Sequence, residues 1–301
     1  MSHYQDVMKI HRQGPAVLLA IFLFFLLAAM TQAGTDRSHG LLWEVSKADT
    51  ESVYLFGTIH SEDPAVLQLT EPVQQAFESS QIVVLEMLLD MEAMLYSSTA
   101  MLMMDGRLLS ELIGEPLFRQ VATAIRTRGI QEPVLERMKP WAAAVTLSMP
   151  VQETGQVLDA ALYQDALQQN KAVYGLETVQ EQLNIFESLS EADQVALLKD
   201  AVENFPEIDA MHAELLAAYK QRDLGGLMAL NETSMKTGDQ RLAEEFQQNL
   251  IVDRNHRMVE RMREYLQQGS AFVAVGALHL PGEEGLLNLL EQQGYTVRRV
   301  Y

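Results

Sequence analysis

Two histidines with matching sequence surroundings are the residues of this chain whose type and spacing best suit chemistry. His60 ends the segment GTIH and His279 ends the segment GALH, so both lie in a Gly-x-x-His motif. Each motif follows a short apolar run, YLF or FVAV, which is typical of a buried strand. Sheets of α/β proteins present functional side chains at the carboxyl ends of their strands, and glycine allows a tight turn there. One such motif carries little information, but the pair predicts that adjacent strands bring both imidazoles to one site.

Glu86 adds a carboxylate to the same predicted site. It follows the apolar run Ile82–Leu85, which predicts a buried strand, and burying a carboxylate there without a nearby cation is costly. Two neutral imidazoles and one carboxylate form an open coordination site for a divalent ion, with room for water. The alternative is that His60 and His279 are structural histidines with ordinary hydrogen bonds. The chain has no cysteine, which excludes thiolate ligands and a cysteine nucleophile.

Several polar residues outside the two motifs are further candidates. Glu177 follows another predicted strand, where it would act as a general base or support the metal site, or simply begin the next helix as a carboxylate favourable to the helix dipole. Arg254, Arg257 and Arg261 recur at helical spacing. They would neutralise the acidic helices, or Arg254 would bind a substrate carboxylate. Asn255 is placed to orient a water or a peptide carbonyl.

Short apolar strands at both ends of the chain and helical periodicity in the middle determine the predicted fold. We expect an α/β (α+β) fold, with a central mixed sheet that carries the two strand–Gly-x-x-His turns and a large helical insertion. The predicted strands are residues 41–45, 53–56, 82–85, 172–176, 272–275 and 295–301, with helices at about 71–79 and 284–293.

The first 33 residues resemble a targeting segment. A basic stretch precedes the uncharged apolar run 16–30, and Thr31-Gln32-Ala33 provides small residues for cleavage, which predicts a secretory signal peptide. The alternative is an uncleaved signal anchor. Residues 34–301 are then a single domain with a helical insertion at about 90–268. The expected location is the periplasm or cell envelope of a bacterium, or the inner membrane facing the periplasm.

Charge limits the classes of partner. The chain has 41 acidic and 22 basic side chains, for a net charge of −19, which argues against binding to nucleic acid. The negative excess falls in residues 179–253, interpreted as solvated helix faces or, alternatively, as a surface for a partner protein. Membrane contact is expected only through the N-terminal segment, and the oligomeric state is left open.

Methionines gather after the predicted strand that ends at Glu86. Their spacing suits a helix face, and thioether side chains more often fill irregular cores than bind copper. The cluster comprises Met87, Met91, Met94, Met101, Met103 and Met104.

Segments along most of the chain resemble the TraB/GumN family, whose relatives include the Tiki metalloproteases. They are LLWEVSKADTESVYLFGTIH, IVVLEM, YGLETVQEQL, DRNHRM and FVAVGALHLPGEEGLLNLLEQQGYTVRRVY. Two Gly-x-x-His motifs with an intervening strand-end Glu define this family. The resemblance implies a sheet with paired turns, peptidase activity and a divalent metal held by His60, Glu86 and His279. It says less about the substrate, because related folds include haem-binding and esterase-type proteins.

The working hypothesis is therefore an exported metal-dependent hydrolase of the metallopeptidase kind. A divalent ion, Mn²⁺, Co²⁺ or Zn²⁺, would activate water, and Glu177, or Glu86 if it is not a ligand, would take the proton. A peptide or protein is the expected substrate. The alternatives are a non-catalytic periplasmic protein that binds haem, metal or a peptide, and an inactive adaptor that binds a partner through its acidic helices.

Overall fold

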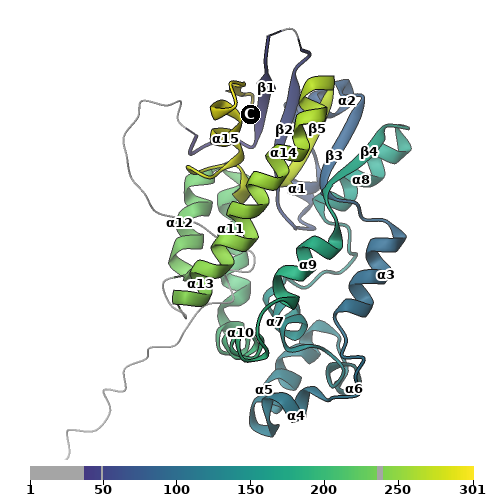
Figure 1. The fold of residues 1–301 in the computed structure, drawn as a ribbon, viewed down its shortest axis with the longest axis vertical. Helices are drawn as coiled ribbons and strands as arrows, with labels where there is room; N and C mark the ends of the chain where they lie inside the picture. Colours follow the sequence, from purple (N-terminus) through teal and green to yellow (C-terminus); the bar gives the residue numbers. More distant parts are fainter. Residues whose placement is uncertain (1–36, 49, 236–239) are drawn as a thin grey trace, which may run out of the picture.

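The computed structural model describes residues 37–48, 50–235 and 240–301 (Figure 1). The predicted signal peptide or anchor lies outside the described residues, so the leader and the single-domain boundary stay predictions. Within the described part of the chain, no helix combines the length and the apolar character needed to cross a bilayer.

The core of the fold is one mixed sheet of six strands, in the order β4-β3-β5-β2-β1-β6. The strands are β1 Leu42–Ser46, β2 Val53–Thr58, β3 Ile82–Met87, β4 Ala172–Glu177, β5 Ala271–Gly276 and β6 Thr296–Arg299. β2, β5, β3 and β4 are mutually parallel, whereas β1 pairs antiparallel with β2 and β6. The predicted α+β class with a mixed sheet is confirmed.

Strand β5 positions the candidate residues because it lies between β2, which leads to His60, and β3, which contains Glu86. Ala271–Val275 is buried throughout, as expected for a strand covered on both faces. Its parallel neighbours are β2 and β3, with Thr58 opposite Gly276 and Leu85 opposite Ala274. The carboxyl ends of β2, β3 and β5 therefore meet at one edge of the sheet.

Helices fill every long connection between the strands. Short helices α1 Pro64–Leu67 and α2 Glu71–Ser79 join β2 to β3, and α2 has the predicted bounds. Between β3 and β4 lie α3 Met91–Ala100, α4 Leu109–Ile113, α5 Glu115–Ile125, α6 Glu132–Leu135, α7 Pro140–Ser148 and α8 Leu158–Gln168. Between β4 and β5 lie α9 Val179–Glu187, α10 Glu191–Asn204, α11 Ile208–Lys220, α12 Leu224–Met235, α13 Gln240–Gln247, the π-helical turn η4 Gln248–Val252 and α14 Asp253–Gln268. The 3₁₀ turn η5 Ala277–His279 and helix α15 Leu286–Gln292 follow β5.

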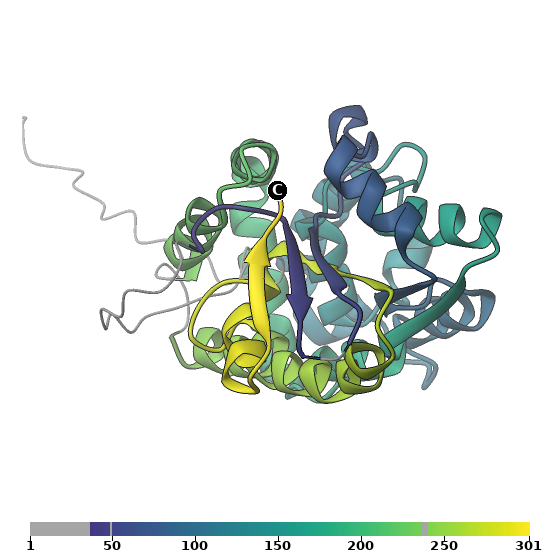
Figure 2. The same cartoon turned by 90° about the horizontal axis from the view of Figure 1, so that it is seen from above.

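The helices and the sheet form two adjoining apolar cores. The first core is built around the sheet and includes α14 and α15, which lie along one face of it (Figure 2). The second core joins α5, α7, α9, α10 and α13 in the half of the molecule that is lower in Figure 1, where Trp141 stacks on Phe186 at 5.6 Å between ring centroids. A cavity described below lies where the two cores meet.

The methionine cluster only partly enters a core. Met103 is 5% exposed, but Met91, Met94 and Met104 are 70%, 63% and 81% exposed. Ala93 is the buried residue of α3, and the helix packs against α9 while its methionines face solvent. The expectation that the cluster fills the core is therefore wrong for these three side chains.

Candidate functional site

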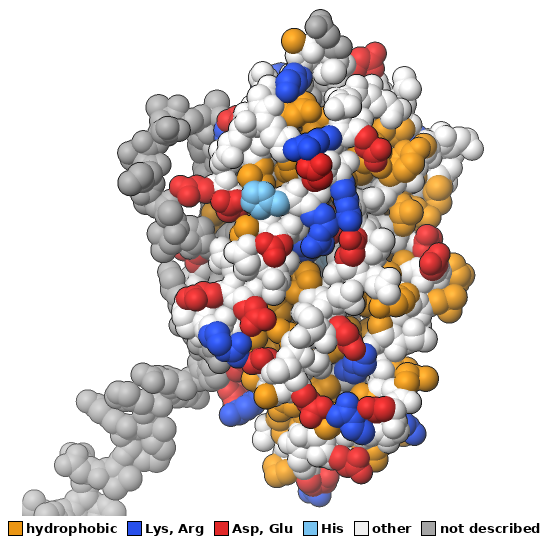
Figure 3. Space-filling view, in the orientation of Figure 1, with side chains coloured by type: hydrophobic (Ala, Val, Ile, Leu, Met, Phe, Trp, Pro, Cys, Tyr) orange, Lys and Arg blue, Asp and Glu red, His pale blue; other side chains and the backbone are white. Residues whose placement is uncertain are grey.

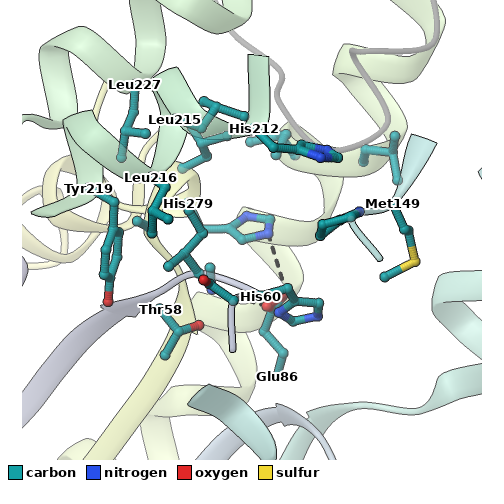
Figure 4. A pocket seen from close by; sticks show the side chains of 18 of the residues that line it. Thr58, His60, Glu86, Met149, His212, Leu215, Leu216, Tyr219, Leu227 and His279 are labelled. Atoms are coloured by element: carbon teal, nitrogen blue, oxygen red, sulfur yellow. Dashed lines mark hydrogen bonds and ion pairs between the residues drawn. The ribbon is translucent and has the colours of Figure 1, made fainter. Parts of the chain in front are cut away.

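The two Gly-x-x-His turns lie side by side at the carboxyl edge of the sheet. β2 ends at Thr58 and β5 ends at Gly276, directly opposite it. A Cβ on Gly57 would lie 2.8 Å from Leu280 Cδ1 and 3.0 Å from the Cα of Ala277, so the close approach of the turns requires glycine there. His60 and His279 both line one cavity, as predicted from the paired motifs (Figure 4).

Glu86 lies on the neighbouring strand β3, and its side chain is close to the two histidines. Its carboxylate accepts a hydrogen bond from the backbone N–H of Gly276 at 3.0 Å, and lies 3.3 Å from Nε2 of His279. Arg254 forms an ion pair with the same carboxylate. Burial alone would raise the pKa of Glu86, but the charges of Arg254, His279 and His60 outweigh it and hold the pKa well below its usual range. Glu86 is therefore a carboxylate at neutral pH.

His279 is oriented by Asn255. The side-chain Nδ2 of Asn255 donates to the backbone carbonyl of Glu284 at 2.6 Å, so its Oδ1 must face Nδ1 of His279, 2.7 Å away. Nδ1 of the imidazole therefore donates, and Nε2 faces the carboxylate of Glu86. In the neutral ring this Nε2 is an acceptor that faces the carboxylate of Glu86 at 3.3 Å, and either a metal ion or a proton on Nε2 would satisfy the pair.

His60 is held from the other side of the cavity by Asp159, a residue of α8. Nδ1 of His60 lies 2.8 Å from Oδ2 of Asp159, and Thr58 donates its hydroxyl to Oδ1 of the same carboxylate at 2.7 Å. Burial alone would lower the pKa of His60, but the charges of Asp159 and Glu86 outweigh it and raise the pKa to about 9. No motif in the sequence marks Asp159; its position in the first turn of a helix was the only available signal.

Arg254 and Glu177 form a buried charge network behind Glu86. Arg254 donates from Nε to Glu177 at 2.8 Å and from another nitrogen to the carbonyl of Leu250 at 3.3 Å, while its third nitrogen binds Glu86. Arg257 donates to the second oxygen of Glu177 at 2.8 Å. The nitrogens of Arg254 are thus engaged within the protein, and the side chain of Glu177 is 0% exposed, outside the cavity lining. Of the alternatives predicted for Glu177, this position suits support of the site, and the catalytic roles of both residues stay predictions.

The cavity itself has a volume of about 430 Å³ and lies between the sheet edge and the helices. Figure 4 shows His60, Glu86 and His279 near one another, with Leu215, Leu216 and His212 of α11 nearby. The other walls of the cavity are mainly apolar and include Met149, Leu183, Phe186, Leu227, Leu250 and Ile251.

His212 of α11 is a third histidine of the cavity. Burial lowers its pKa, with a smaller effect in the same direction from Arg128, so the ring is neutral at pH 7. Its isolated position on α11 in the sequence gave no signal of this location, because only the packing of α11 over the sheet edge brings it to the cavity.

A divalent ion fits part of this donor set. Two ligand atoms that are each about 2.1 Å from a tetrahedral ion lie about 3.4 Å apart, close to the 3.3 Å between Nε2 of His279 and Oε1 of Glu86. Both histidines have Nδ1 engaged by an outer partner, as metal-bound histidines usually do. Across residues 37–48, 50–235 and 240–301, however, no three His, Asp or Glu side chains are arranged to hold an ion together.

Comparison with known protein families gives an assignment for the chain. Residues 41–299 match the model of the TraB/PrgY/gumN family, and the chain belongs to this family.

Named relatives are distant. Two zebrafish (Danio rerio) proteins, Metalloprotease TIKI2 and Metalloprotease TIKI1, are 26% and 25% identical to this chain over 86% of its length. An uncharacterized protein of Treponema pallidum (strain Nichols) is 23% identical over 84% of this chain and 80% of its own length. The chain spans only 60% and 63% of the two zebrafish relatives. No solved structure matches it.

Proposed function

We propose that this protein is an exported metal-dependent hydrolase that cleaves peptide bonds. The observation that carries the proposal is that Nε2 of His279 and the carboxylate of Glu86 face each other at 3.3 Å, the spacing of two ligands of one ion, in a cavity also lined by His60. Membership of a family with relatives named metalloproteases supports the same activity.

In this proposal His60 and His279 would hold the ion through Nε2, with His60 releasing the proton that its raised pKa keeps there in the metal-free protein. Glu86 is either a third ligand or the base. Bound Mn²⁺, Co²⁺ or Zn²⁺ would supply a water of lowered pKa and polarise the scissile carbonyl. Glu86 lines the cavity and Glu177 does not, so Glu86 is the better placed of the two to accept a proton. Arg254 holds the carboxylate of Glu86 in place, and Asn255 holds the ring of His279.

The cavity walls favour an uncharged, apolar segment of a peptide or protein as the substrate. Among the described residues, Arg254 is the one arginine or lysine in the lining, and its nitrogens are engaged by Glu86, Glu177 and Leu250. A substrate carboxylate would have to displace one of these contacts. Apolar side chains next to the scissile bond would instead remove the exposed surface of the cavity wall from water.

The test is hydrolysis of two peptide pools, one with apolar and one with acidic residues around each internal bond, with Mn²⁺, Co²⁺ or Zn²⁺ added. We expect cleavage of the apolar pool, with activity lost in His60→Ala and in His279→Ala while the thermal midpoint stays near that of the wild type. His39→Ala is the matched control, because His39 is exposed and outside the cavity lining. No hydrolysis with any of the three ions would contradict the proposal.

A second candidate function is binding without turnover. The observation in its favour is that the described residues form no ready group of three ligands, although the cavity has about 430 Å³ of space beside two histidines. Such a protein would hold haem, a metal or a peptide. Haem would give a Soret band in protein from haem-replete cells, and a bound peptide would be recovered intact.

Export to a bacterial periplasm is part of the main proposal and rests on the sequence of residues 1–33. Fractionation of cells that express the full chain, compared with a chain that starts at residue 34, tests it. We expect the full chain in the periplasmic or envelope fraction and the shortened chain in the cytoplasm. Equal distribution of the two chains would contradict export.

A further inference from the structure

A buried carboxylate outside the two Gly-x-x-His motifs contacts the residues at the end of strand β2. Asp159 lies in the first turn of α8 and is 9% exposed. One of its oxygens accepts the hydroxyl of Thr58 at 2.7 Å, and the other lies 2.8 Å from Nδ1 of His60. Burying a carboxylate is costly unless both oxygens have partners. Here both groups come from the same short turn, Thr58 through a hydrogen bond and His60 through an ion-pair contact.

The contact fixes which nitrogen of His60 faces the cavity. Nδ1 is directed to Asp159, so Nε2 lies on the opposite side of the ring, and His60 is part of the cavity lining with its side chain 37% exposed. A carboxylate on one ring nitrogen orients an imidazole and makes the other nitrogen a better ligand. Asn255 makes the equivalent contact to His279, but with a neutral amide.

The loop before Asp159 is also bound by a second residue of the turn that carries His60. Residues 149–157 join α7 to α8, and Glu62, two residues after His60, binds the middle of this connection. The carboxylate of Glu62 accepts the backbone N–H groups of Glu153 at 2.7 Å and Thr154 at 3.0 Å, and also that of Gly155. Gly155 has a positive φ of 75°, which glycine adopts without strain.

This connection also forms part of the cavity wall. Met149 and Pro150, at its start, line the cavity, and Asp159 follows its end. The segment from Met149 to Asp159 is therefore held by Glu62 in its middle and by Thr58 and His60 at its end. Movement of the segment would alter the wall and the orientation of His60 together.

We propose that Asp159 is a positioning residue that directs Nε2 of His60 into the cavity. Glu62 holds in place residues 149–157, the connection that leads to Asp159. The inference rests on the proposed function only where it names a metal ion as the group that His60 binds. The contacts of Asp159 and Glu62 can be tested in the metal-free protein.

The first test is the affinity of the full chain for Zn²⁺, measured by competition with a fluorescent chelator. Asp159→Asn keeps the shape of the side chain but removes its charge, and should weaken Zn²⁺ binding about 10–100-fold. Asp165→Asn is the matched control, because Asp165 is an exposed acid on the same helix. Equal affinity in the two variants would overturn the positioning role.

The second test uses proton NMR of the metal-free protein and does not depend on metal binding or activity. The proton on Nδ1 of His60, held by Asp159, should give a downfield resonance that disappears in both His60→Ala and Asp159→Asn and persists in Asp165→Asn. Its absence from the wild type, or its persistence in Asp159→Asn, would overturn the proposal. If the resonance behaves as expected while the wild type binds no Zn²⁺, the proposed function fails and the positioning role stands.

The role of Glu62 is tested by hydrogen exchange of the backbone amides of residues 153–155. Glu62→Ala removes charge-assisted hydrogen bonds, so these amides should exchange at least about tenfold faster. Glu153→Ala is the control, because Glu153 contacts Glu62 only through its backbone N–H. Unchanged protection in Glu62→Ala would overturn this part of the proposal.

Discussion

At the scale of single residues, the site is a series of buried groups in which each charge faces its opposite. Glu86 binds Arg254, and Arg254 binds Glu177. Arg257 completes the series on the far side of Glu177. A buried ion is tolerated when partners of opposite charge surround it, so the loss of any member leaves its neighbour uncompensated. The series explains how Glu86 stays ionised beside an apolar cavity.

Glu177→Gln tests this series, because Glu177 is the one carboxylate that two arginines share within it. The substitution leaves the guanidinium of Arg254, 10% exposed, without half of its compensation. We expect the free energy of unfolding to fall by about 3–5 kcal/mol in urea denaturation. The control is Glu260→Gln, whose side chain is 64% exposed and should change stability little. Similar losses in the two variants would contradict the role of Glu177.

At the scale of elements, the site depends on the parallel alignment of β2, β5 and β3. Two turns with the same motif can lie side by side only because β2 and β5 are adjacent and in register at Thr58 and Gly276. The glycines of the two motifs are not equivalent. Gly57 is in close contact with the second turn, whereas a Cβ on Gly276 would meet ordinary contacts of 3.5 Å.

Gly57→Ala should therefore lower the free energy of unfolding more than Gly276→Ala does. The added methyl group at position 57 overlaps Leu280 and Ala277 and must separate the turns, at a cost of about 1–3 kcal/mol. Gly276→Ala, at the matching strand end, should change the free energy of unfolding by less. Urea denaturation of both variants checks this difference. An equal loss of stability in the two variants, or a larger loss in Gly276→Ala, would show that the fold does not require glycine at position 57.

The start of α9 is tied to α14 by an ion pair whose pH dependence can be measured. Hydrogen bonds from Arg261, together with the cap of the helix at Thr178, lower the pKa of Glu181 from its usual 4.5 to about 2. Because the folded pKa is the lower one, the stabilisation is complete above pH 4.5 and is lost as the pH falls toward 2.

Glu181→Gln should consequently lower the thermal midpoint at pH 6 and have a smaller effect at pH 3. The glutamine retains a side chain able to cap the helix, so the variant removes mainly the charge. Thermal unfolding of both proteins at the two pH values measures the difference. A deficit that is the same at pH 3 and pH 6 would mean that the charge of Glu181 does not stabilise the fold.

The sequence predicts the local parts of this arrangement better than its contacts. The helix at residues 71–79 and the strands before both motifs follow from apolar patterns, and α2 and β5 agree closely with them. The last strand is shorter than the predicted 295–301, since β6 comprises Thr296–Arg299. The roles of Asp159 and His212 depend on how α8 and α11 pack over the sheet edge, and periodicity carries no information on such distant contacts.

At the scale of the whole molecule, the cavity exists because the sheet core and the helical core meet at the carboxyl edge of the strands. Residues of both cores line it, among them Leu215 and Leu227 from the first and Phe186 and Ile251 from the second. On the face that Figure 3 shows, acidic, basic and apolar side chains are interspersed over the helices. The net charge of −19 thus does not form a single acidic patch on this face, and the absence of nucleic-acid binding stays a prediction.

The metal content of the purified full chain tests the central claim most directly. Elemental analysis, after dialysis against a metal-free buffer, should find about one divalent ion of manganese, cobalt or zinc per chain, because histidine and carboxylate ligands suit these ions. His60→Ala and His279→Ala should each lose it, while His39→Ala retains it. A wild-type chain without a bound ion, or a His60→Ala/His279→Ala double variant that keeps the ion, would contradict a metal centre at the paired turns.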